Sequence, residues 1–89
     1  MKDIETRETL HRKVLLICGR YARDTRQKAG LSLRGMSLYT GYSESALSKF
    51  ERGMLDSLWL MCLYLPTMTI MDQRNMINEL EGVIAYDNQ

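Results

Sequence analysis

Apolar residues recur along the first third of the chain at intervals of four, three and four, which places them on one face of a helix. The members of this stripe are Leu10, Val14, Ile17 and Tyr21. The pattern predicts a long first helix from roughly Thr9 to Ala29. Gly30 follows as a residue that can adopt the left-handed conformation after a helix C-terminus.

A shorter second helix is predicted after this glycine. Ser32 can cap it by accepting a hydrogen bond from an amide of its first turn, and the helix continues to about Thr40. The side chains expected to be buried are Met36 and one of its neighbours, Leu38 or Tyr39.

A tight turn and a third helix follow directly. Gly41 can adopt a left-handed backbone conformation in the turn, and Ser43 can cap the helix after it. This helix is expected from about Glu44 to Arg52, where Gly53 closes it. Its buried face is expected to contain Ala46, Leu47 and Phe50, and its outward face Glu44, Ser45, Ser48 and Lys49.

Two further helices are predicted in the last third of the chain. Asp56 or Ser57 can cap a fourth helix, which covers residues 58–65 and is stopped by Pro66. Because this helix is apolar all round, its own domain or a second chain must cover it on every side. A last helix over about residues 72–85 is expected to pack on it. The apolar stripe of the last helix comprises Met76, Ile77, Leu80, Val83 and Ile84.

Length and composition agree with an all-α fold. The 89 residues, 45% of them apolar, suffice for one small core, and β-branched residues nowhere alternate with polar ones over a useful length. Residues 1–8 are expected to form a flexible N-terminus. Residues 9–89 are expected to form a single domain whose last helix serves packing or dimerisation.

No signal peptide is expected, because the amino terminus is charged and the apolar run from Val14 to Cys18 is short and flanked by Arg and Lys. No membrane span is expected either, because the longest apolar run, residues 58–66, is too short. Cys18 and Cys62 lie in apolar helical patterns without a metal-binding spacing. They are expected to be reduced core thiols of a cytoplasmic protein.

The two halves of the chain carry opposite net charge. Residues 1–53 hold eleven Lys and Arg against six Asp and Glu, whereas residues 54–89 hold one, Arg74, against five. The first half, with a net charge of +5, therefore has the sign that attracts phosphate groups, and the second half, with −4, does not.

No set of residues in this sequence matches the pattern of a catalytic site. His11 is the only histidine, has no Cys or carboxylate at ligand spacing, and is expected to be a solvated surface residue. Glu79 and Glu81 are expected on the solvated face of the last helix. We therefore expect no enzyme activity, no catalytic residue, no metal and no cofactor.

Three segments carry a family resemblance: Arg26 with Gly30-Leu31-Ser32, the turn Thr40-Gly41-Tyr42-Ser43, and Ser48-Lys49-Phe50-Glu51-Arg52-Gly53. Across them the chain resembles the phage repressor and Cro type of helix-turn-helix domain, also called the XRE family. The resemblance implies a five-helix lambda-repressor-like domain in which the second and third helices form the helix-turn-helix. It also implies an ion pair between Arg26 and Glu51 that locks the third helix onto the first.

The resemblance further implies a sequence-specific transcriptional regulator, a repressor from a phage or mobile element. Its third helix would enter the major groove of a double-stranded DNA operator. Lys49 can donate to guanine, and Glu44 can accept from the cytosine amino group. The implied base-contacting residues are Ser43, Glu44, Ser45, Ser48 and Lys49. The implied phosphate-contacting residues are Ser32, Arg34, Tyr42 and Arg52.

Such regulators bind pseudo-palindromic operators as homodimers, with half-sites about one turn of DNA apart. Apolar residues of the last two helices are the candidates for the dimer interface, and they can equally be core. These candidates are Leu58, Trp59, Met61, Met76, Ile77, Leu80 and Ile84.

The sequence leaves a second function open, because the outward face of the third helix is short in base-contacting groups and Leu33 stands where the family often has Gln. A protein-binding regulator, such as an antirepressor or an inhibitor of a host complex, could keep this fold. It would bind its protein partner through the Met-rich second half, where five of the seven methionines lie between Met54 and Met76. A third interpretation is that the helix-turn-helix serves packing only.

Overall fold

The computed structural model describes residues 4–87, and these residues form an all-α fold without strands. The elements are α1 (Ile4–Lys28), α2 (Leu33–Thr40), α3 (Glu44–Glu51), α4 (Leu58–Tyr64), the short 3₁₀ turn η1 (Leu65–Thr67) and α5 (Ile70–Asp87). The expected all-α class is confirmed. Residues 1–3 and 88–89, which the sequence assigned to a flexible N-terminus and to the end of the domain, lie outside the described residues.

Helix α1 is longer than its apolar stripe predicts, because it begins at Ile4 rather than near Thr9. Residues 4–8 contain neither Gly nor Pro, and adding residues to an existing helix costs far less than starting one. The helix ends as expected. Gly30 has a φ of +74°, and the amide of Leu31 donates to the carbonyl of Arg26 at 3.1 Å.

The caps of the two short helices are the serines expected from the sequence. The Ser32 hydroxyl accepts a hydrogen bond from the amide of Gly35 at 3.0 Å, and the Ser43 hydroxyl accepts one from the amide of Ala46 at 3.1 Å. Between the two helices Gly41 has a φ of +80°. Because a side chain would strain this left-handed conformation, glycine suits the turn.

The buried side of α2 is narrower than expected. Met36 is completely buried, but Leu38 and Tyr39 are 81% and 56% exposed, so neither of them is the expected second buried residue. Leu38, two positions after Met36, points to the opposite side of the helix. Tyr39, three positions after Met36, lies at the edge of the buried side, where no other element covers it. In α3, Leu47 and Phe50 are buried as expected.

Helix α4 is covered on one side only. Ser57 caps it by accepting a hydrogen bond from the amide of Leu60 at 3.1 Å. Leu60 and Tyr64, one turn apart, are completely buried, whereas Leu58 and Trp59 are 79% and 63% exposed. This chain therefore leaves uncovered one face of a helix whose sequence is apolar all round.

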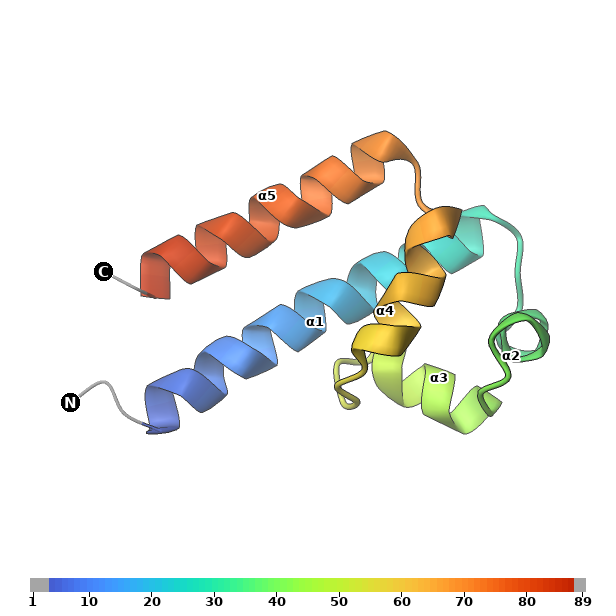
Figure 1. Ribbon diagram of the computed structural model, residues 1–89, viewed down its shortest axis with the longest axis horizontal. Helices are drawn as coiled ribbons and strands as arrows, with labels where there is room; N and C mark the ends of the chain where they lie inside the picture. Colours follow the sequence, from blue (N-terminus) through green and yellow to red (C-terminus); the bar gives the residue numbers. More distant parts are fainter. Residues whose placement is uncertain (1–3, 88–89) are drawn as a thin grey trace.

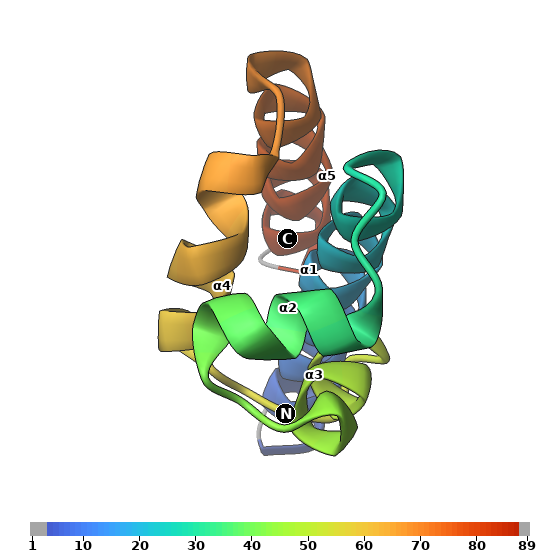
Figure 2. The same cartoon turned by 90° about the vertical axis from the view of Figure 1, so that its right-hand side faces the viewer.

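Helix α5 packs along α1 and not, as expected, on α4. After η1 the chain turns back, and α5 runs antiparallel to α1 (Figure 1). Met76 is buried against α1, and the Lys28 ammonium lies 3.2 Å from the Asp72 carboxylate. The start of α1 and the end of α5 consequently lie at one end of the molecule, while α2 and α3 form the opposite end (Figures 1 and 2).

The core lies where α1, α3 and α4 meet. Its buried apolar side chains are Ala22, Met36, Leu47, Phe50, Leu60, Tyr64, Met68 and Met76. Cys18 borders this core half-buried, and burial raises the pKa of its thiol. Cys62 was expected in the core but is exposed, since it lies on the uncovered side of α4. None of the described helices is long and apolar enough to cross a membrane.

Candidate nucleic-acid interface

Helix α3 presents a polar face to solvent at the end of the molecule formed with α2. The base-contacting candidates Ser43, Glu44, Ser45 and Lys49 are exposed, and Ser48 is half-buried on the same side. The opposite side carries Leu47, Phe50 and Glu51, which are all buried. The structure therefore brings all five candidates together on one surface.

A buried polar network holds this helix in place. The Arg26 guanidinium donates to both carboxylate oxygens of Glu51, with Nε 2.7 Å from Oε2 and Nη2 2.9 Å from Oε1. The Tyr64 hydroxyl donates to the same Oε2 at 2.6 Å. Arg26 and Glu51 are 9% and 7% exposed and Tyr64 is completely buried. The ion pair implied by the family resemblance is thus present, with Tyr64 as a third member that sequence reasoning missed.

The electrostatics of the network follow from its burial. The hydrogen bond to Glu51 raises the pKa of Arg26, so the guanidinium stays charged. Burial raises the pKa of Tyr64, and its hydrogen bond to Glu51 raises it further, so the hydroxyl keeps its proton and remains a donor. With three donors on two carboxylate oxygens, Glu51 can be buried without an unsatisfied charge.

Gly19 allows α1 and α3 to touch through their backbones. A Cβ atom at this position would lie 2.6 Å from the carbonyl oxygens of both Phe50 and Glu51, which real Cβ atoms do not approach so closely. Sequence reasoning missed this residue. An isolated glycine inside a helical pattern was the available signal.

Side-chain hydrogen bonds close the turn between α2 and α3. The Ser37 hydroxyl donates to the carbonyl oxygen of Tyr42, so this serine has a structural role in the turn. The Thr40 hydroxyl donates to the carbonyl of Met36 at 2.9 Å and accepts from the amide of Tyr42 at 3.2 Å. These bonds fix the angle between the two helices.

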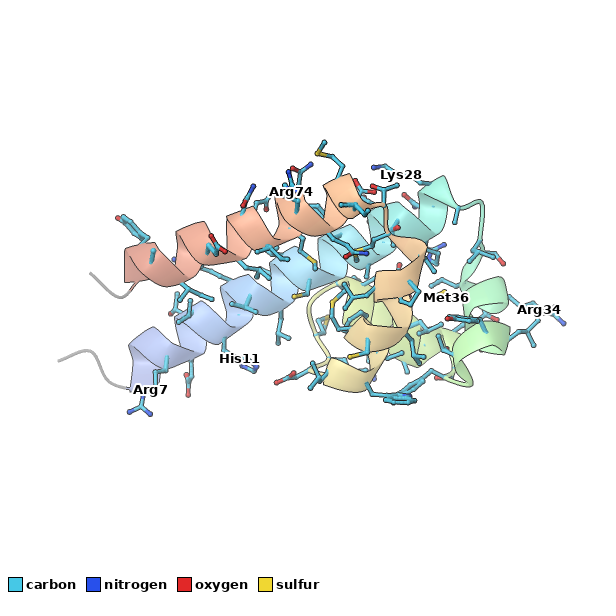
Figure 3. The ribbon with its side chains drawn as sticks, turned by 45° about the horizontal axis from the view of Figure 1, so that its top comes forward. Arg7, His11, Lys28, Arg34, Met36 and Arg74 are labelled. Atoms are coloured by element: carbon cyan, nitrogen blue, oxygen red, sulfur yellow. The ribbon has the colours of Figure 1, made fainter. Side chains whose placement is uncertain are left out.

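The phosphate-contacting candidates flank α3. Ser32 and Arg34 are exposed at the start of α2, and the Arg34 side chain extends away from the body of the molecule (Figure 3). Arg52 is exposed at the end of α3, and its Nε donates to the carbonyl of Ser48 at 3.2 Å. Tyr42 is half-buried and packs against the core.

The dimer candidates do not form one surface. Met76 is buried, and Met61 and Leu80 are partly buried against the core, so these three serve this chain's own packing. The candidates that remain exposed lie on two separate helices. They are Leu58 and Trp59 on α4, and Ile77 and Ile84 on α5.

Two titratable residues have partners that the sequence did not reveal. His11 is exposed as expected, but its Nε2 lies 2.8 Å from the Asp56 carboxylate, which joins α1 to the segment before α4. Glu79 is exposed as expected, and it also accepts hydrogen bonds from Arg20 and, at 2.9 Å, from the Tyr21 hydroxyl. Within residues 4–87 no group of three or more His, Cys, Asp or Glu residues is placed to hold a metal ion.

Comparisons with protein-family models, with curated proteins and with solved structures find no match for this chain.

Proposed function

We propose that this chain is a sequence-specific DNA-binding regulator of transcription in which α2, the turn and α3 form a lambda-repressor-like helix-turn-helix. The observation that carries the proposal is that buried contacts hold α3 in one orientation against the rest of the molecule. Its outer side is polar and uncovered, while its inner side is held by the buried contact of Glu51 with Arg26 and Tyr64. A helix that reads base edges needs such a fixed orientation, because a small displacement loses the hydrogen bonds.

Base reading is assigned to the outward residues of α3. The side chain of Lys49 has no hydrogen bond or ion pair among the described residues, so its ammonium is available to guanine O6 and N7. The hydroxyl of Ser45 can donate or accept, and the Glu44 carboxylate can accept from a cytosine amino group. Arg34 and Arg52, on either side of this row, are assigned to phosphates, where they set the register of the protein on DNA.

The proposed homodimer forms through the outward stripe of α5. Ile70, Ile77 and Ile84 recur every seven residues and are 79%, 49% and 41% exposed. Arg74 and Glu81 lie on the same stripe, and neither has a polar partner among the described residues. Figure 3 shows Arg74 on the side of α5 that faces away from α1.

This stripe is complementary to itself. If two α5 helices pair antiparallel about Ile77, Ile70 lies opposite Ile84 of the partner subunit, and Arg74 lies beside Glu81 of the partner subunit. Each copy then covers the apolar residues of the other and supplies the charge that the other lacks. A second copy of this chain is therefore the occupant that the stripe fits.

Selection from a pool of random-sequence duplexes at two salt concentrations tests the DNA-binding proposal. We expect enrichment of a short inverted repeat and an affinity that falls steeply with salt, because Lys and Arg displace counterions from phosphates. If the protein retains no duplex even at low salt, the proposal is wrong.

A second candidate function rests on α4. Leu58 and Trp59, which are 79% and 63% exposed, form an apolar surface apart from the α5 stripe, and tryptophan is enriched among residues that dominate protein interfaces. This surface favours a protein-binding regulator whose partner presents an apolar face. Trp59→Ser should then abolish binding of that partner while leaving any DNA binding unchanged.

A further inference from the structure

A hollow of about 280 Å³ opens where α1, the start of α2 and the outward face of α3 meet. Its rim is formed by Arg23, Gln27, Leu33, Ser48 and Arg52, and the Arg26–Glu51 ion pair lies beneath it. The hollow is smaller than the roughly 300 Å³ or more of drug-sized ligand sites, so a small group suits it better than a whole ligand. Because Ser48 on this rim is itself a base-contacting candidate, the hollow lies directly beside the other candidates on α3.

The hollow is positively charged. The Arg26–Glu51 pair is neutral and its carboxylate is fully hydrogen-bonded, which leaves the charges of Arg23 and Arg52 uncompensated. Both of these arginines are exposed. Arg52 uses only Nε, in its bond to the Ser48 carbonyl, so its two terminal nitrogens remain free to donate.

Arg23 differs from its basic neighbours on α1. Arg20 is bonded to Glu79 and Lys28 to Asp72, so α5 neutralises both. The side chain of Arg23 has no hydrogen bond or ion pair with any described residue. It is therefore a cation on this part of α1 that is available to a ligand.

We propose that this hollow seats one backbone phosphate of the bound DNA, held between the guanidinium groups of Arg23 and Arg52. The inference rests on the proposed DNA-binding function and adds a contact from α1 to it. Guanidinium groups bind phosphate oxygens through paired N–H donors. Leu33 offers no side-chain donor at the start of α2, so at this junction the donors come from the two arginines, from Gln27 and from the Ser48 hydroxyl.

The test is the salt dependence of binding to a selected duplex and to an unrelated duplex. Arg23→Gln should weaken binding to both duplexes by the same factor and reduce the slope of log K against log salt by about 1, because one phosphate contact is lost. Arg23→Lys should keep most of the slope, since the charge remains, while losing part of the affinity.

Arg12→Gln is the matched control. Arg12 lies eleven residues before Arg23, which is about three turns along the same face of α1, and it is exposed but remote from the hollow. This variant should bind with the affinity and slope of the unmodified protein. Because Arg12 and Arg23 are both exposed, neither substitution should alter the thermal unfolding midpoint.

Two failures are distinguishable. If the unmodified protein binds neither duplex, the proposed function itself is wrong. If it binds with a steep salt dependence, but Arg23→Gln and Arg12→Gln give the same slope, DNA binding stands and the phosphate seat is overturned.

Discussion

Glu51 is the residue on which the orientation of α3 depends. Its carboxylate joins α3 to Arg26 on α1 and to Tyr64 on α4, so three elements meet at two oxygen atoms. A buried ion pair contributes little net stability, because desolvation offsets most of the attraction, but removing one partner is costly. The network therefore acts chiefly by allowing one arrangement of these helices and disfavouring others.

Replacing Gly19 by alanine adds one methyl group and so tests the close contact between α1 and α3. We expect Gly19→Ala to lower the free energy of unfolding by about 1 to 3 kcal/mol, because the new Cβ collides with the carbonyl oxygens of Phe50 and Glu51. Urea denaturation measures the change.

Gly82→Ala is the matched control for this prediction. Gly82 also lies inside a helix, but an added Cβ meets no atom within 4 Å. There alanine should raise the stability by about 0.5 to 1 kcal/mol, through helix propensity alone. Equal effects of the two substitutions would contradict the close approach at Gly19.

Sequence reasoning reached part of this residue-scale detail. The ion pair between Arg26 and Glu51 could be predicted, because both residues lie in segments that resemble a known family. Tyr64 was counted among the apolar residues of α4, since a hydroxyl gives no periodic signal. Gly19 was missed because the contact joins residues far apart in the chain, which no local pattern encodes.

At the scale of whole elements, the pairing of α1 with α5 combines burial of apolar side chains such as Met76 with polar contacts between the two helices. Periodicity predicted which side of α5 is apolar, but not which helix it would contact. Glu79 and Asp72 give α1 a specific match, because they meet Arg20, Tyr21 and Lys28 there. Because Glu79 was assigned to a solvated face, its contact with α1 was not predicted.

This pairing should weaken in acid. Hydrogen bonds from Arg20 and Lys28 lower the pKa of Glu79 and of Asp72 below their ordinary values of 4.5 and 3.8. A carboxyl with a lowered pKa adds stability above its ordinary value and loses it as the pH falls through the lowered one. The free energy of unfolding should therefore decrease as the pH falls below about 4.5.

Glu79→Gln isolates the contribution of one carboxylate. The variant should show a shallower decrease of stability in acid than the unmodified protein, and the two should differ most at neutral pH. The difference is expected to be modest, since both Arg20 and Glu79 are about half exposed. Identical pH profiles would show that the contact with Arg20 and Tyr21 adds nothing to stability.

At the scale of the whole molecule, the fold determines which charged side chains are paired and which are not. Acidic residues of α5 neutralise Arg20 and Lys28 of α1, whereas the side chains of Arg23, Arg34 and Lys49, around α2 and α3, have no ionic partner among the described residues. The charge difference between the two halves of the sequence indicated this division. It could not indicate which individual arginines would stay free, because that depends on how the helices dock.

The proposed dimer makes a prediction about charge reversal. Arg74→Glu or Glu81→Arg alone should weaken self-association roughly fivefold or more, since the two-fold axis repeats each like-charge contact. The double variant, with both charges reversed, should restore it. Sedimentation equilibrium measures the dissociation constant of the dimer for each variant. A monomeric unmodified protein, or a double variant no better than either single one, would rule out this antiparallel interface.

The measurement that most directly tests the proposed role of α3 compares Lys49→Ala with Arg34→Ala on a selected duplex and on an unrelated one. We expect Lys49→Ala to weaken binding to the selected duplex by about 1 to 3 kcal/mol and to leave binding to the unrelated duplex nearly unchanged. Arg34→Ala should weaken both equally and flatten the salt dependence. Equal losses on both duplexes for Lys49→Ala would contradict base reading by α3.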